Sequence, residues 1–163
     1  MRDAAFPRSR RLKRRRLIRP LFDRARPDVG RVRVGTVQIR YRVAPRAEVG
    51  RETPVQAGFS PGRRRTNARR GALRRRLRET FRRHSAALAA RFDAPGPGGA
   101  RPATTLTLFV LYRGPDDDAS RRIEHDLPRA LRRLERDLDA AGGAPQPGAR
   151  LPVERPVPDH QPR

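Results

Sequence analysis

The sequence predicts one α/β (α+β) sandwich, in which a small mixed sheet is packed with helices mainly on one face. The first observation is the alternation of apolar and polar residues in 31–43 and 53–60, which is typical of half-buried strands. The second is the stretch 104–113, which is apolar on both parities from Leu106 onward, as a central strand covered on both faces is. The third is the helical spacing of apolar residues in 17–24, 67–92 and 119–141. The predicted order is helix, strand, strand, helix, strand, helix, and we expect the open sheet face to be available to a ligand.

The first predicted helix, 17–24, follows a strongly basic segment. The run "RSRRLKRRR" contains seven basic residues and no acidic one, which is typical of a solvated or nucleic-acid-binding arm. We expect 1–10 to be a flexible basic arm. The apolar stripe of the helix consists of Leu17, Ile18, Leu21 and Phe22. Because proline lacks an N–H and restricts φ, Pro20 predicts that the helix starts or bends there.

The strand at 31–43 changes parity at Gly35-Thr36, and this change predicts a β-bulge. We expect the next strand, 53–60, to pair with it as a hairpin. Phe59 alternates with the buried positions of that second strand, so the pattern favours a core position for it.

The helix at 67–92 carries many arginines and one acidic residue, Glu79, which we expect to pair with Arg75, Arg82 or Arg83. Thr66 and Asn67 are both suitable N-cap residues. One side of the helix is apolar, with Leu73, Leu77, Phe81 and Leu88. The other side carries Arg74, Arg75, Arg78 and Arg82. Guanidinium groups bind phosphate oxygens and stack on bases, so this side is expected to bind RNA, with a solvated helix face as the alternative.

The C-terminal third begins with a loop at 93–103 and the strand at 104–113. Three aspartates, Asp116 to Asp118, then precede the last helix; we expect them to cap it, with binding of a hydrated metal ion as the alternative. Pro128 predicts a kink or a late start in the helix at 119–141. The Pro- and Gly-rich stretch 142–163 is expected to be a disordered tail, so the predicted domain is 11–141.

The charge balance indicates the class of partner. The chain has 163 residues, of which 40 are basic and 17 acidic, and its net charge is +23. A compact domain with this excess repels itself unless a polyanion neutralises it, so we expect nucleic acid as the partner. A GC-rich coding sequence would explain arginine in place of lysine, but it does not explain the excess of basic over acidic residues.

Several other classes of site and location are not expected. The chain has no cysteine, and no apolar run approaches the roughly 20 residues of a membrane span. We therefore expect a cytoplasmic protein without disulfides, thiolate metal sites or membrane contact. His84, His125 and His160 lie at no metal-ligand spacing, and neither a catalytic residue nor a protein-bound metal is predicted.

Four stretches together resemble the bacterial ribonuclease P protein component. They are "RLKRRRLIRPLF", "VQIRYRV", "GFSPGRRRTNARRGALRRRLRETFR" and "LTLFVLYRGP". The third is the strongest, because it is similar to the family's strand, its basic turn and its helix motif Arg-Asn-x-x-Lys-Arg-x-x-Arg-Glu-x-Phe-Arg. On this resemblance the motif falls on Arg70, Gly71, Arg74, Arg75, Arg78, Glu79, Phe81 and Arg82, with Gly71 in place of the family's asparagine.

The resemblance implies a fold like that of ribosomal protein S5 domain 2, and a monomeric subunit that binds one catalytic RNA. The complex would remove the 5′ leader of precursor tRNA, with the chemistry and most of the Mg²⁺ belonging to the RNA. The residues implied to bind RNA are Arg65, Arg69, Arg70, Gly71, Arg74, Arg75, Arg78 and Arg82. Those implied to line a leader cleft are Arg11, Lys13, Ile18, Phe22 and Tyr41, with Ile18 at a position where the family has an aromatic residue.

Two other classes of protein stay open. A structural RNA-binding protein of ribosomal type would explain the charge equally well, although an arginine helix directly after a strand favours the ribonuclease P subunit. A DNA-compacting basic protein would need no helix with one apolar and one basic side.

Overall fold

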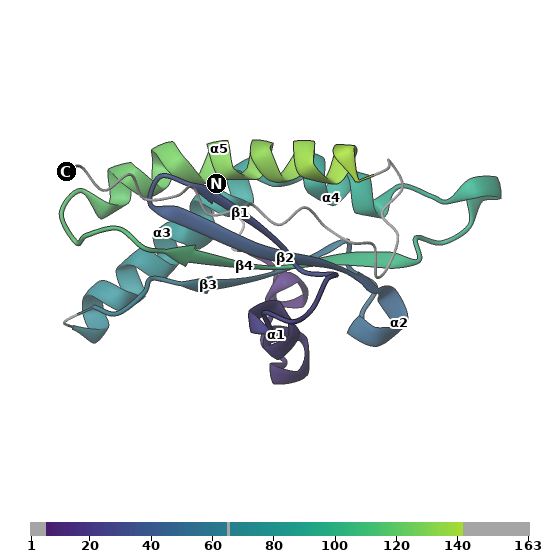
Figure 1. Cartoon of the computed structure of the whole chain (residues 1–163), viewed down its shortest axis with the longest axis horizontal. Helices are drawn as coiled ribbons and strands as arrows, with labels where there is room; N and C mark the ends of the chain where they lie inside the picture. The colour runs from purple at the N-terminus through teal and green to yellow at the C-terminus, as the bar shows by residue number, and fades with distance from the viewer. Residues whose placement is uncertain (1–5, 65, 142–163) are drawn as a thin grey trace, which may run out of the picture.

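The strands of the chain form one mixed sheet in the order β1-β2-β4-β3 (Figure 1). The computed structural model describes residues 6–64 and 66–141. The strands are β1 (Gly30–Val34), β2 (Val37–Pro45), β3 (Val55–Ser60) and β4 (Thr104–Tyr112). β2 pairs antiparallel with both β1 and β4, whereas β3 runs parallel to β4. The predicted α/β class and the central position of the last strand are confirmed.

The helices lie on both faces of this sheet (Figure 1). They are the 3₁₀ turns η1 (Arg8–Arg10) and η2 (Pro97–Gly99) and the α-helices α1 (Arg15–Phe22), α2 (Arg46–Val49), α3 (Asn67–His84), α4 (Ala86–Asp93) and α5 (Ala119–Ala140). α3, α4 and α5 cover one face with a large hydrophobic core. α1 and α2 pack on the other face over a smaller core that contains Leu17, Leu21 and Val49. The second face is therefore only partly open, since α1 and α2 cover part of it.

The stretch 31–43 forms two strands and not one bulged strand. Gly35 has a positive φ of 52°, and together with Thr36 it makes the turn of a hairpin between β1 and β2. The carboxylate of Asp126 in α5 accepts hydrogen bonds from the Thr36 backbone N–H at 2.8 Å and from its hydroxyl at 2.7 Å. A change of parity is compatible with a bulge and with a tight turn, and this contact from a distant helix stabilises the turn.

The predicted pairing of 53–60 with the preceding strand is also wrong. β3 pairs only with β4 in the sheet, with Val55 opposite Leu106 and Ser60 opposite Leu111. A parallel pair needs a long crossover connection, and α3 and α4 supply it. The arginine helix is therefore the connection between two neighbouring parallel strands.

The boundaries of two predicted helices differ from the structure, and those of the third agree. The expected helix 67–92 is interrupted at Ser85, a residue with non-helical angles (φ −103°, ψ 9°) that lies between α3 and α4. α5 (Ala119–Ala140) confirms the predicted range 119–141, and because it continues through Pro128 the alternative of a late start is excluded. α1 likewise begins before Pro20 and includes it.

The N-terminal residues that the structure describes are ordered against the domain. Phe6 is buried, and its ring lies edge-to-face with the rings of Phe59 and Phe81, at centroid distances of 5.7 and 5.8 Å. Further along, the Leu12 N–H donates to the Ala57 carbonyl at 2.9 Å, so this segment covers the outer edge of β3. The interpretation of 1–10 as a flexible arm is therefore wrong for residues 6–10. Residues 1–5 and the predicted tail 142–163 lie outside the described residues.

Candidate nucleic-acid interface

α3 has the predicted apolar and basic sides. The Thr66 hydroxyl caps the helix by accepting a hydrogen bond from the Arg69 N–H at 3.2 Å. Leu73, Leu77 and Phe81 are buried in the large core. The opposite side of the helix is thereby directed to solvent, and it carries exposed arginines, which are Arg69, Arg70, Arg74, Arg75, Arg76 and Arg83.

Ion pairs neutralise one part of this basic side and leave another part unpaired. Arg76 and Arg83 approach the Glu124 carboxylate of α5 at 2.7 and 3.6 Å, while Arg82 pairs with Glu79 at 3.1 Å. In contrast, Arg70, Arg74, Arg75 and Arg78 form no ion pair with a carboxylate of the described residues. These four side chains are therefore the part of α3 best suited to bind an external anion.

The N-terminal segment brings a further guanidinium to these unpaired arginines. Burial lowers the pKa of Arg78 from its usual value, and the nearby positive charges of Arg11 and Arg74 lower it further. Arg11 is held by a hydrogen bond from its Nη2 to the Phe6 carbonyl at 3.2 Å. The Nε atoms of Arg11 and Arg78 are buried and have no hydrogen-bond partner among the described residues. We call Arg11, Arg74, Arg75 and Arg78 the guanidinium cluster; an anion bound here would relieve the repulsion between these charges.

Three residues predicted to bind RNA need separate comment. An added Cβ at Gly71 would meet only the Arg75 guanidinium at 3.6 Å, so packing within the described residues does not require a glycine. Arg82 lies beside Glu79, one of the three pairings that the sequence left open for that glutamate. Arg65 lies outside the described residues.

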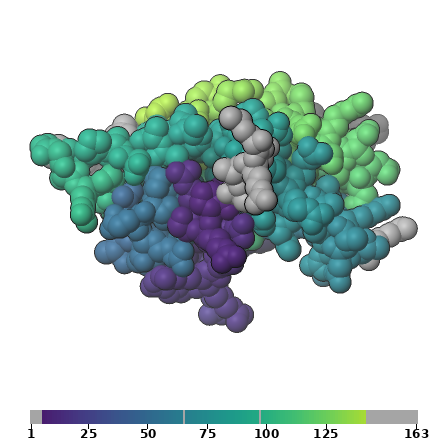
Figure 2. All heavy atoms as spheres, turned by 180° about the vertical axis from the view of Figure 1, so that it is seen from behind, coloured from purple at the N-terminus to yellow at the C-terminus, as the bar shows by residue number. Residues whose placement is uncertain are grey.

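The α1 side of the sheet carries an aromatic surface. Phe22 is 39 % exposed, and its ring lies edge-to-face with that of Phe109 at 5.3 Å. The Arg40 guanidinium stacks over Phe22 at 5.0 Å from the ring centroid. Ile18 is half-buried against the smaller core, whereas Lys13 is exposed. Figure 2 shows the purple N-terminal residues on the molecular surface beside the blue region that contains α2. The Arg14 Nη1 donates a hydrogen bond to the Val49 carbonyl of α2 at 3.1 Å.

Tyr41 does not belong to this surface. Successive residues of β2 point to opposite faces of the sheet, so Arg40 faces α1 while Tyr41 faces the large core. The Tyr41 side chain is fully buried, and burial raises the pKa of its hydroxyl. The predicted place of Tyr41 in a leader cleft is therefore corrected to a core position.

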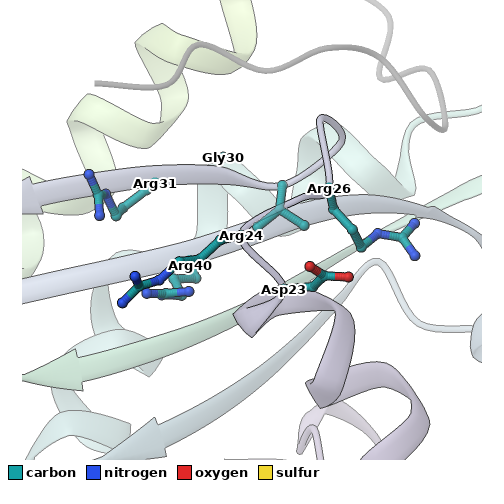
Figure 3. A pocket seen from close by; sticks show the side chains of 7 residues that line it. Asp23, Arg24, Arg26, Gly30, Arg31 and Arg40 are labelled. Atoms are coloured by element: carbon teal, nitrogen blue, oxygen red, sulfur yellow. The ribbon is translucent and has the colours of Figure 1, made fainter. Parts of the chain in front are cut away.

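A cationic pocket adjoins Phe22 at the loop between α1 and β1. Its volume is about 270 Å³, and Figure 3 shows the side chains of Arg24, Arg31 and Arg40 around it, with Asp23 at its rim. The Arg40 Nη1 donates to the Leu21 carbonyl at 3.3 Å, while its Nε is buried without a partner among the described residues. Burial lowers the pKa of Arg40, followed by the positive charges of Arg31, Arg113 and Arg24. This pocket can accept a phosphate group beside an exposed aromatic ring.

Sequence reasoning missed this pocket, although a signal existed. Arg40 and Arg42 occupy the polar positions of the alternating strand 31–43 and share one face. Their surroundings differ, because Arg42 is buried and binds Asp28 and Glu48, both at 2.7 Å. The alternation therefore indicated the face of each arginine but not which of them is available to a ligand.

Two features next to α3 have structural roles. Arg64 is held by the carbonyls of Pro61 and Gly114 and by the Asp116 carboxylate at 2.6 Å, and it stacks on the Tyr112 ring at 4.8 Å. Asp116 also approaches Arg69 at 3.4 Å.

The predicted capping of α5 by the aspartates is wrong for their side chains, since the N-cap residue Asp118 makes no side-chain cap hydrogen bond.

Within residues 6–64 and 66–141, no group of three or more His, Asp or Glu side chains is placed to hold a metal ion. The described helices include none that is both long enough and apolar enough to cross a membrane.

Comparison of the chain with protein-family models, with curated proteins and with solved structures found no match. The candidate interface has two basic surfaces, which are the guanidinium cluster of α3 and Arg11 and the cationic pocket beside the aromatic ring of Phe22.

Proposed function

We propose that this chain is an RNA-binding protein of the ribonuclease P type, the accessory protein subunit of an endoribonuclease whose catalyst is RNA. In this proposal it binds the catalytic RNA and the 5′ leader of precursor tRNA, and it assists Mg²⁺-dependent removal of the leader. The proposal rests on the resemblance of the sequence and on the two surfaces described above.

The observation that carries the proposal is the guanidinium cluster. Arg11 comes from the segment before α1, whereas Arg74, Arg75 and Arg78 come from the crossover helix. Burial lowers the pKa of Arg78, and folding brings the other positive charges of the cluster close enough to lower it further. Such an arrangement of like charges is relieved by a bound anion, and an RNA backbone supplies phosphates in a continuous row. An RNA partner therefore accounts for the cluster better than a solvated helix face does.

The α1 side supports a role in holding single-stranded RNA. Bases stack on aromatic side chains with little sequence preference, and basic side chains follow the backbone. Phe22 offers an exposed ring, and Arg24, Arg31 and Arg40 surround the adjacent pocket. We assign this surface to the leader, with Arg40 taking the place that the sequence suggested for Tyr41.

The roles of Mg²⁺ and of the protein are separated in this proposal. The described residues contain no cluster of three candidate metal ligands. Mg²⁺ and the cleavage chemistry belong to the RNA subunit. The protein's arginines and Phe22 bind and orient the substrate.

Reconstitution tests the proposal directly. The purified protein is added to the ribonuclease P RNA of the same organism, and removal of the 5′ leader from precursor tRNA is followed at low Mg²⁺. Strong stimulation is expected for the native protein, and weaker stimulation for a variant with Arg74→Gln and Arg78→Gln. Tight RNA binding without stimulation would refute the proposal and favour a structural RNA-binding protein of ribosomal type.

A further inference from the structure

The outward face of α5 carries a second basic surface, separate from α3 and α1. Ile123, Leu127 and Leu134 direct one side of this helix into the large core. The opposite side exposes side chains at helical spacing, which are Arg121, His125, Arg129, Arg132 and Arg136. We call these five residues the α5 stripe. It contains no carboxylate, although α5 has several acidic residues.

Four of the acidic residues of α5 have partners outside the stripe, although the Asp126 carboxylate also lies 2.9 Å from the His125 ring of the stripe. Glu124 binds arginines of α3, and Asp126 accepts hydrogen bonds from Thr36 of the hairpin turn. Asp137 pairs with Arg133 at 3.0 Å, and Asp139 pairs with Arg91 of α4. The carboxylates of Glu124, Asp126, Asp137 and Asp139 are therefore engaged by ion pairs or hydrogen bonds that involve none of the stripe arginines.

The arginines of the stripe have no such partners. Arg121, Arg129, Arg132 and Arg136 form no ion pair with a carboxylate of the described residues. The only hydrogen bond that involves their side chains in this part of the chain joins Arg129 to His125 at 3.3 Å. The four arginines of the stripe therefore form a row of positive charge without a carboxylate partner among the described residues, whereas His125 lies against the Asp126 carboxylate.

The shape and composition of the stripe favour a double-helical RNA as its ligand. From Arg121 to Arg136 a helix rises roughly 22 Å, at 1.5 Å per residue, so the charges form a straight and rigid row. The stripe contains no aromatic residue, and stacking on aromatic rings is how proteins hold single strands. Double-stranded RNA is recognised mainly through its backbone and shape, which a rigid row of arginines can contact.

The position of α5 allows two RNA segments to bind at once. Figure 1 shows α5 and α1 on opposite sides of the sheet. An RNA strand against Phe22 therefore does not occupy the α5 stripe. We propose that the α5 stripe binds the phosphate backbone of a second, double-helical RNA segment, so that one protein molecule holds two RNA segments on opposite sides of its sheet. This proposal does not depend on leader cleavage.

The first test measures the affinity of the full chain for a short blunt-ended RNA duplex by fluorescence anisotropy over a range of salt concentrations. The variant Arg132→Gln with Arg136→Gln is compared with a matched control, Arg51→Gln with Arg101→Gln, which removes two exposed arginines outside the three surfaces. The slope of log affinity against log salt is expected to fall by about two units in the stripe variant, at about 0.9 per phosphate contact. The control is expected to keep the native slope. Equal slopes in the two variants would overturn the proposal.

Two further variants separate loss of the surface from loss of the fold. Arg132→Lys with Arg136→Lys keeps both charges and is expected to retain the native salt slope. Arg74→Gln with Arg75→Gln removes charge from α3 and is expected to leave most of the duplex binding in place. If the α3 variant loses duplex binding while the stripe variant keeps it, the duplex binds α3 and the proposal is wrong.

The second test asks whether two RNA molecules bind together. A single-stranded RNA without secondary structure is fixed to beads, protein is added, and capture of a labelled duplex is measured. Native protein and the control variant are expected to capture the duplex, whereas the stripe variant is expected to bind the beads but release the duplex. Displacement of the single strand by duplex in a one-to-one ratio would show a single shared site and overturn the proposal.

Discussion

Replacing Arg78 with methionine is expected to change RNA affinity and protein stability in different directions. Arg78 is half-buried, its Nε lacks a partner among the described residues, and the charges of Arg11 and Arg74 face it. Methionine keeps most of the apolar stem and removes the charge. The free protein is therefore relieved of like-charge repulsion and of one unsatisfied buried donor.

The magnitudes follow from these contacts. Loss of a charge-assisted hydrogen bond to phosphate costs about 1.5–3 kcal/mol, which corresponds to roughly 10- to 150-fold weaker RNA binding. The free energy of unfolding of the free protein is expected to stay unchanged or to rise by up to about 1 kcal/mol, the scale of a screened charge pair. A residue that served the fold alone would show the opposite pattern, with lower stability and unchanged affinity.

The assay combines urea unfolding of the free protein with RNA titration at fixed salt. Arg64→Met is the matched control, because Arg64 is bound by two carbonyls, by Asp116 and by the Tyr112 ring. That variant is expected to lose about 2–4 kcal/mol of stability, since it leaves buried partners unsatisfied. If Arg78→Met destabilised the protein as much as Arg64→Met, or left RNA affinity unchanged, the assignment of the guanidinium cluster would be refuted.

Three other substitutions test the aromatic surface at Phe22, the core position of Tyr41 and the buried ion pairs of Asp28. Phe22→Ala is expected to weaken binding of single-stranded RNA by about 1–3 kcal/mol and to leave duplex binding unchanged, as measured by anisotropy with both probes. Tyr41→Phe is expected to keep RNA affinity and to keep or slightly raise the melting temperature, because the buried hydroxyl has no partner among the described residues; a loss of affinity would return Tyr41 to the ligand surface. Asp28 has its pKa held well below the usual range, first by its hydrogen bond from Arg26 and also by Arg42. A carboxyl group whose pKa is lowered by folding stabilises the folded state at any pH above its pKa in the unfolded chain, which is about 4. This stabilisation is lost as the pH falls from that value towards the lower pKa of the folded state. Asp28→Asn is therefore expected to be less stable at neutral pH and to lose less further stability in acid, and parallel pH profiles of the two proteins would contradict this.

Local periodicity predicted the helices of this chain well, because the faces of a helix depend on residues three or four positions apart. Leu73, Leu77 and Phe81 are buried as their spacing indicates. The strand pairing of 53–60 was predicted wrongly, because its partner in β4 follows only after two intervening helices. The hairpin turn at Gly35 was missed for a similar reason, since Asp126, which stabilises it, lies in the last helix.

The candidate site was predictable as residue types but not as an arrangement. The charge of α3 indicated an RNA-binding face, yet nothing local indicated that Arg11 would lie near Arg78. Arg40 and Arg42 look equivalent in the sequence, and only distant carboxylates make Arg42 a buried structural residue. The alternation correctly placed Tyr41 on the opposite face of the sheet from Arg40. It could not indicate that the face of Tyr41 is covered by the large core and the face of Arg40 by α1.

The parallel pairing of β3 with β4 has a consequence for how the protein is made. During synthesis from the N-terminus, β1 and β2 can form their hairpin early, whereas β3 has no sheet partner until β4 has left the ribosome. In that interval α3 is already exposed, with its arginines and its apolar side both unsheltered. Slow translation of the Pro- and Gly-rich loop before β4 would lengthen the interval in which β3 has no sheet partner.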